Sequence, residues 1–277
     1  MSASLMVCRR LAGSSKTLHR CGNHGWNTKS VPSVIHPRYW RAMSTAFSGS
    51  FLDLNFQDEG IAVVAMKRGE NTLHLKVMEE WHKALDAIEQ TSECRALVTT
   101  GNEKFFCNGF DLQYMETIMD QERQLAQFVD EFNKLIVRLM LFPLPTVAAI
   151  SSHAFAGGAI LALAHDLRVM RRDRGWVCLN EILIDVTFPP VLLSFIRAKL
   201  APGPLLTQAV LQAKRYTAEE AVKCGIVDKV VDQSQLVNTA AQMANEFLGK
   251  QGIKRETLHS FKKDLYSPVL QAYSGQV

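Results

Sequence analysis

Residues 153–169, HAFAGGAILALAHDLRV, place two glycines at the start of an apolar run. A glycine inside a helix costs about 1 kcal/mol relative to alanine, so Gly157 and Gly158 require a reason. The run follows a short apolar segment, TVAAIS (146–151), that is typical of a buried strand. A helix beginning at about Gly157 has first amides without internal acceptors, at the positive end of its dipole. Either the glycines let a ligand oxygen approach these amides, or they let the helix pack closely against a neighbour.

A second stretch, KFFCNGFDL (104–112), repeats this order of elements. It follows the apolar segment RALVTTG (95–101) and carries a glycine in a turn that leads to a predicted helix. An oxyanion hole needs two converging N–H donors, often from separate loops. Two units of strand, glycine turn and helix can each supply one donor. The pair therefore favours an enzyme that stabilises an oxyanion.

The rest of the chain predicts an α/β protein. Residues 51–68 indicate two strands joined at 58–60, and residues 72–90 have apolar side chains at helical spacing. A long amphipathic helix is predicted over 121–142, ending before the PLP at 143–145. Residues 205–248 indicate mainly helix, interrupted at Gly225. This alternation predicts a core over 46–204 and a helical C-terminal segment over 205–277.

The basic charge is confined to the N-terminal part of the chain. The first acidic residue is Asp53, whereas the first 52 residues contain seven Lys or Arg; the remaining 24 basic and 27 acidic residues give a net charge of −3. An acid-free, Arg-rich and Ser-containing N-terminus predicts a mitochondrial transit peptide over 1–45 and a location in the matrix; a disordered basic tail is the alternative. Because the basic excess lies in a removable segment, nucleic-acid binding is not expected.

Other classes of protein are disfavoured by composition. The six cysteines show no close pairing, which argues against a disulfide framework or a metal site and favours a reducing compartment. The chain has no uninterrupted apolar run of about 18 residues, so we expect no membrane span.

Four motifs in order resemble the enoyl-CoA hydratase/isomerase family, the crotonase superfamily. Residues 106–112 (FCNGFDL) resemble its F-S-A-G-x-D-L signature, and residues 151–166 resemble its N-G-x-A-x-G-G-G-x-x-L-A-x-x-x-D signature. Residues 67–81 and 215–231 resemble two further family segments, so the resemblance spans about 50–245. It implies a crotonase-like α/β fold of ββα units with a helical C-terminal segment. It also implies an acyl-CoA substrate, with coenzyme A as part of the substrate rather than a cofactor, and a homotrimer or hexamer.

The resemblance assigns the oxyanion donors to the backbone N–H groups of Asn108 and Gly157, which would hold the thioester oxygen. It implies a substrate-binding set made of both donors, Glu181 and their neighbours Cys107, Gly109, Asp111 and Gly158. Three positions depart from the family pattern: Asn108 replaces an alanine, and Ser152 and Ala156 replace glycines.

The carboxylates indicate which reaction is expected. Family hydratases use two glutamates, and the first position is Ile160 here. The second is Glu181, in a Leu-Asn-Glu sequence that is similar to the mitochondrial Δ3,Δ2-enoyl-CoA isomerases. A 1,3-proton shift needs one base, which takes a proton from C2 and returns it to C4. The resemblance therefore implies an isomerase of fatty-acid β-oxidation, with a thioester hydrolase or a non-catalytic acyl-CoA-binding protein as alternatives.

Several further residues need an interpretation. Asp185 stands where the family usually has glycine; it would either raise the pKa of the base or obstruct the acyl tunnel. We expect His153, His165 and Asp166 to have packing roles. Cys107 lacks a histidine in a recognisable arrangement, so it is not expected to be a nucleophile. The lysines 199, 262 and 263 are expected to be solvated, with contacts to coenzyme A phosphates as the alternative.

Overall fold

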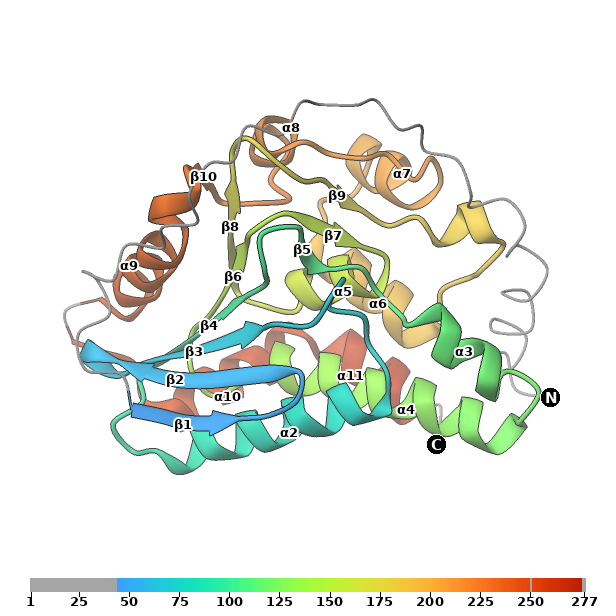
Figure 1. The fold of residues 1–277 in the computed structure, drawn as a ribbon. Helices are drawn as coiled ribbons and strands as arrows, with labels where there is room; N and C mark the ends of the chain where they lie inside the picture. Colours follow the sequence, from blue (N-terminus) through green and yellow to red (C-terminus); the bar gives the residue numbers. More distant parts are fainter. Residues whose placement is uncertain (1–43, 250, 276–277) are drawn as a thin grey trace, which may run out of the picture.

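A seven-stranded sheet forms the centre of the protein. The structure, a computed structural model, describes residues 44–249 and 251–275 (Figure 1). Residues 1–43 of the predicted transit peptide (1–45) lie outside the described residues. The strand order is β1-β2-β3-β4-β6-β8-β10, with the first three strands antiparallel and the others parallel. The strands are Ser44–Ser48, Leu52–Gln57, Ile61–Met66, Ala96–Thr100, Thr146–Ile150, Leu167–Arg171 and Lys229–Val231.

A smaller parallel sheet brings the two glycine turns together. It contains β5 (Phe105–Cys107), β7 (His153–Phe155) and β9 (Val177–Cys178), with β7 in the middle. Since β5 and β7 are parallel neighbours, their carboxyl ends lie at the same edge of the sheet. The turns that follow them lead to α3 (Leu112–Ile118) and α5 (Gly157–Leu163). The topology therefore places both predicted donor turns side by side.

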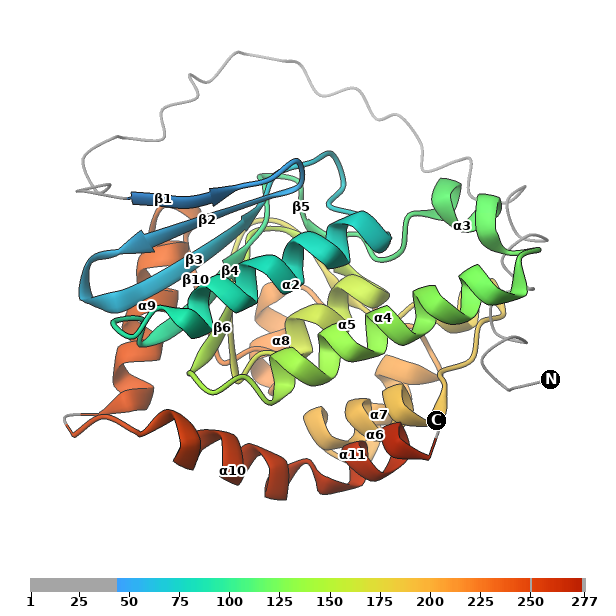
Figure 2. The same cartoon turned by 90° about the horizontal axis from the view of Figure 1, so that it is seen from below.

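Helices cover both faces of the large sheet (Figures 1 and 2). On one side α2 (Leu75–Gln90) and α4 (Glu122–Met140) pack together over the main apolar core, which includes Trp81, Phe128 and Phe132. On the other side α9 (Leu236–Leu248) packs on β4, β6 and β8 and closes a second core. None of the described helices is long and apolar enough to cross a membrane.

The C-terminal segment is helical, as predicted, with one exception. It contains α7 (Pro204–Val210), α8 (Ala218–Lys223), α9, α10 (Arg255–Leu265) and α11 (Ser267–Ser274). The exception is the edge strand β10, which pairs with β8 inside a segment that the sequence predicts as helix. The helix α11 returns to pack against α6 (Pro190–Lys199), so the segment is joined to the core.

Candidate active site

A cavity of about 720 Å³ lies at the ends of β5, β7 and β9. Both glycine turns, one face of α4 and residues 180–192 form its walls. Much of the lining is apolar and consists of Phe110, Val129, Phe132, Ile160, Ile184, Val186, Phe188, Pro189 and Leu192. Such a surface suits an aliphatic chain, because apolar area removed from water stabilises the bound state.

The two glycines of α5 have different roles. A Cβ atom on Gly158 would lie 2.0 Å from the carbonyl oxygen of Cys107, so only glycine allows this close approach of backbones. Gly157 lines the cavity and begins α5, and its N–H has no hydrogen-bond acceptor among the described residues. Of the two interpretations of the glycine pair, close packing therefore describes Gly158, and an amide open to a ligand describes Gly157.

The structure corrects the other predicted oxyanion donor. The Asn108 N–H donates to the carbonyl oxygen of Glu70 at 3.0 Å, and the Asn108 Nδ2 donates to Glu70 Oε2 at 2.6 Å. An amide that already has an acceptor cannot hold a thioester oxygen. Two residues further on, the Phe110 N–H makes no hydrogen bond within the described part of the chain, and Phe110 lines the cavity.

The Phe110 and Gly157 amides belong to turns that touch. Between Asn108 and Phe110 the chain turns at Gly109, whose φ is +86°. A Cβ atom on Gly109 would lie 3.2 Å from the backbone nitrogen of Gly157. Phe110, whose N–H has no acceptor in the described residues, thus follows a glycine that packs closely on the backbone nitrogen of Gly157.

Of the four predicted binding residues that neighbour the donors, only Asp111 lines the cavity, and the other three pack behind its surface. Cys107 is fully buried behind the cavity, and burial raises the pKa of its thiol to about 12, which fits the expectation that it is no nucleophile. Gly109 and Gly158 pack between the turns and are not among the lining residues. Asp111 does line the cavity, and its Oδ1 accepts the Tyr114 N–H at 3.0 Å as the N-cap of α3.

Glu181 lines the cavity, and its carboxyl group has a raised pKa. It begins a 3₁₀ turn, Glu181–Ile184, and is 7% exposed. Burial raises its pKa to about 8, and its Oε2 has no hydrogen-bond partner in the described residues. Ile160 lines the same cavity. The cavity therefore combines the Glu181 carboxyl, whose pKa burial raises, with the aliphatic Ile160 at the position of the first family glutamate.

Asp185 fits neither of the two roles considered for it. It is exposed, it does not line the cavity, and burial rather than Asp185 raises the pKa of Glu181. Asp185 instead ends the 3₁₀ turn with φ +55°, in the left-handed region. Glycine adopts this conformation without strain and aspartate tolerates it, which explains why glycine is usual there.

Two of the three lysines are not solvated, contrary to expectation, and only Lys263 is exposed. The Lys262 Nζ is buried and donates to Asp166 Oδ2 at 2.6 Å and to two backbone carbonyls. The Lys199 Nζ donates to the hydroxyl of Tyr266 at 2.8 Å. The contacts of Lys262 hold α10 against the core, and the contact of Lys199 holds Tyr266, between α10 and α11, against α6.

The predicted packing histidines do pack. His165 is buried and lies 2.8 Å from Thr99 Oγ1. His153 stacks on Phe155 and contacts the ring of Trp176. No cluster of His, Cys, Asp and Glu in the described ranges could hold a metal ion.

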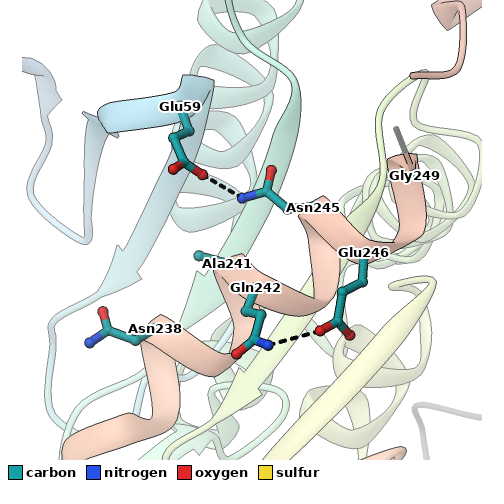
Figure 3. Close-up of a pocket in the computed structure, with 7 residues that line it drawn as sticks. All are labelled: Glu59, Asn238, Ala241, Gln242, Asn245, Glu246 and Gly249. Carbon is teal, nitrogen blue, oxygen red and sulfur yellow. Dashed lines mark hydrogen bonds between the residues drawn. The ribbon is translucent and has the colours of Figure 1, made fainter. Parts of the chain in front are cut away.

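A second hollow, of about 660 Å³, lies between α9 and Glu59, in the turn that precedes β3, and shares no lining residue with the cavity (Figure 3). It is lined mainly by polar side chains. Asn245 donates to Glu59 at 2.7 Å, and Gln242 donates to Glu246 at 2.8 Å. These side chains are thus paired with one another, and none of the predicted site residues lies there.

Residues 57–275 match the family model described as enoyl-CoA hydratase/isomerase, and the chain belongs to this family. It is 34% identical over 203 residues to the peroxisomal enoyl-CoA delta isomerase 2 of Arabidopsis thaliana, covering 72% of this chain and 85% of that protein. A probable enoyl-CoA hydratase of Mycobacterium tuberculosis has a similar structure, with a TM-score of 0.72, 27% identity and coverage of 81% and 92%. The human mitochondrial delta3-delta2-enoyl-CoA isomerase, 22% identical, shares the fold with a TM-score of 0.71 over 81% and 91% of the chains. The predicted crotonase-like fold is confirmed.

Proposed function

We propose that the protein is an enoyl-CoA delta isomerase that converts 3-enoyl-CoA to 2-trans-enoyl-CoA in fatty-acid β-oxidation. The observation that carries this proposal is Glu181, a buried carboxyl with a pKa of about 8 that shares its cavity with Ile160. Isomerisation needs one group that is first base and then acid, and such a group works best with a pKa near the working pH. The similarity to the Arabidopsis isomerase supports the same reaction.

The oxyanion donors in this proposal are the backbone N–H groups of Phe110 and Gly157. They hold the thioester oxygen of the acyl-CoA, so that negative charge developing on this oxygen is stabilised and the C2 proton becomes acidic. Loss of one such donor typically costs about 10²–10³ in rate. The helix dipole of α5 adds positive potential at Gly157.

The proton transfer then needs Glu181 alone. The carboxylate removes a proton from C2, the electrons of this C–H bond form a dienolate, and the C3=C4 electrons take up the returned proton at C4. The double bond moves to C2=C3 and Glu181 is again ionised. The apolar wall holds the acyl chain and excludes water, which limits competing hydration. This chemistry requires no metal and no cofactor, since coenzyme A is part of the substrate.

An open cavity favours an enzyme over the non-catalytic alternative. A protein that had lost activity would have no reason to keep an uncompensated buried carboxyl in a cavity of about 720 Å³. Thioester hydrolysis needs a water molecule held beside the thioester carbonyl as well as a base, and the aliphatic Ile160 offers such a water no hydrogen bond.

The test uses 3-hexenoyl-CoA and crotonyl-CoA with purified protein. Isomerisation of 3-hexenoyl-CoA is followed by the ultraviolet absorbance of the conjugated 2-enoyl thioester that forms. Hydration of crotonyl-CoA is followed by the decrease in the same absorbance. We expect isomerisation to exceed hydration by orders of magnitude. Equal rates would contradict a mechanism with one base, and release of free coenzyme A would indicate a hydrolase.

We also propose a mitochondrial matrix location and a homotrimer or hexamer. The support for the location is the absence of acidic residues before Asp53; the Arabidopsis relative is described as peroxisomal, so a direct test is needed. A fluorescent reporter fused to residues 1–50 should enter mitochondria, and a cytosolic signal would exclude a mitochondrial location.

Light scattering after size-exclusion chromatography gives the oligomeric state, and a monomer would contradict the proposed homotrimer or hexamer.

A further inference from the structure

The helix α4 contributes two apolar side chains and one polar side chain, Asn133, to the wall of the cavity. Val129, Phe132 and Asn133 follow helical spacing and all line the cavity, so they share one face of α4. Asn133 is 3% exposed, and its Oδ1 has no hydrogen-bond partner in the described part of the chain. A buried amide without a partner lowers stability. A leucine of similar shape would avoid this cost, so the amide requires a functional reason.

A second amide of the cavity, on a half-buried residue, also has an oxygen without a partner in the described residues. Asn180, next to the proposed base, also lines the cavity and has a buried Oδ1 without a partner among the described residues. Two other polar side chains of the lining are engaged, since Asn108 donates to Glu70 and Asp111 caps α3. The third buried oxygen of the lining without a partner in the described residues is Glu181 Oε2, which belongs to the proposed base. The two unpaired amides therefore mark where the cavity can accept a hydrogen bond from something that is not protein.

We propose that Asn133, assisted by Asn180, binds a hydroxyl group on the acyl chain, so that hydroxylated acyl-CoA thioesters are a preferred ligand class of this cavity. An amide oxygen accepts the hydroxyl proton, and the amide NH₂ can donate to the hydroxyl oxygen in return. An unsubstituted chain leaves the amide buried and unpaired, so it binds more weakly than a chain whose hydroxyl group makes the hydrogen bond. The inference rests on the proposed acyl-CoA function but not on the isomerisation step.

The experiment measures binding of saturated ligands, which lack the double bond and cannot be isomerised. The probes are hexanoyl-CoA, 3-hydroxyhexanoyl-CoA and 6-hydroxyhexanoyl-CoA, titrated calorimetrically into the full chain. We expect at least one hydroxylated probe to bind about 10-fold more tightly than hexanoyl-CoA, the gain of about one well-made hydrogen bond. In Asn133→Leu this preference should disappear, while hexanoyl-CoA binds as well as before or better.

The matched control is Val129→Leu, which changes the shape of the same wall without removing a polar group and should keep the hydroxyl preference. Thermal unfolding is measured in parallel, and Asn133→Leu should not lower the melting temperature.

Three results would overturn the inference. The first is the absence of any hydroxyl preference in the unmodified protein. The second is a preference that survives Asn133→Leu, with a shifted pH–rate profile on 3-hexenoyl-CoA, which would assign Asn133 to Glu181 instead. The third is an equal loss of affinity for all probes with a lowered melting temperature, which would assign the amide a structural role. Isomerase activity on 3-hexenoyl-CoA is measured separately, so its absence would refute the proposed function without deciding the hydroxyl preference.

Discussion

Replacing Glu181 by glutamine tests the proposed base directly. Glutamine keeps the shape of the side chain and removes its ability to exchange a proton. Loss of general acid–base catalysis costs about 10²–10⁴ in rate, and the upper end is expected because both proton transfers depend on one group. Binding of acyl-CoA should change little, since the proposed contacts to the thioester are the amides of Phe110 and Gly157. The values of kcat and kcat/KM should therefore fall together.

The raised pKa of Glu181 adds a pH signature to this prediction. With a pKa of about 8, about one carboxyl in ten is ionised at pH 7, so the isomerisation rate should rise with pH and level off above about 8. Stability has the opposite trend, because the folded state holds the Glu181 proton more tightly than the unfolded chain does. The contribution of Glu181 to the free energy of unfolding is therefore highest below pH 4.5, the ordinary pKa of a glutamate, where Glu181 is protonated in both states. It falls as the pH rises from there through about 8, the pKa of Glu181 in the folded state.

The size of this effect follows from the same pKa values. At about 1.4 kcal/mol per pKa unit the difference amounts to a few kcal/mol. Urea unfolding at pH 5 and pH 9 should show that Glu181→Gln gains stability relative to the unmodified protein as pH rises. The control is Asp185→Asn, which should leave rate, pH profile and stability nearly unchanged because Asp185 is exposed. If Asp185→Asn loses activity while Glu181→Gln keeps it, the base has been placed on the wrong carboxylate.

Other substitutions test the supports of the site. Gly158→Ala puts a Cβ atom against the Cys107 carbonyl oxygen and should lower the free energy of unfolding by about 1–3 kcal/mol, measured in urea. Lys262→Met leaves the Asp166 carboxylate buried without its partner and should cost about 3–5 kcal/mol, part of which a second change, Asp166→Asn, should restore. Asn108→Ala should keep kcat on 3-hexenoyl-CoA within about 10-fold, since its amide already donates to another residue; a loss of about 10³ would return the donor role to position 108.

Local pattern was sufficient for most elements of the fold. Apolar runs predicted the strands β4 and β6, and helical spacing predicted α2 and α4, because each of these elements buries a face long enough to show its period. The strand β10 was missed, since it has three residues at the edge of the sheet and no face of its own that repeats. Its pairing with β8 depends on a contact between segments far apart in the chain.

The same division applies to the site. Residue types and their spacing by themselves pointed to the two glycine turns, because the need for a glycine at a close approach of backbones is a property of the residue. The choice of Glu181 came from the family resemblance, and its role as the base is a proposal. Only the tertiary structure decided which amide is free. The Asn108 N–H is engaged by Glu70, and Lys262 is buried against Asp166, through contacts between residues distant in sequence. Hydrogen bonds and desolvation depend on which groups come into contact in the folded chain, and a local sequence pattern does not show which distant residues these are.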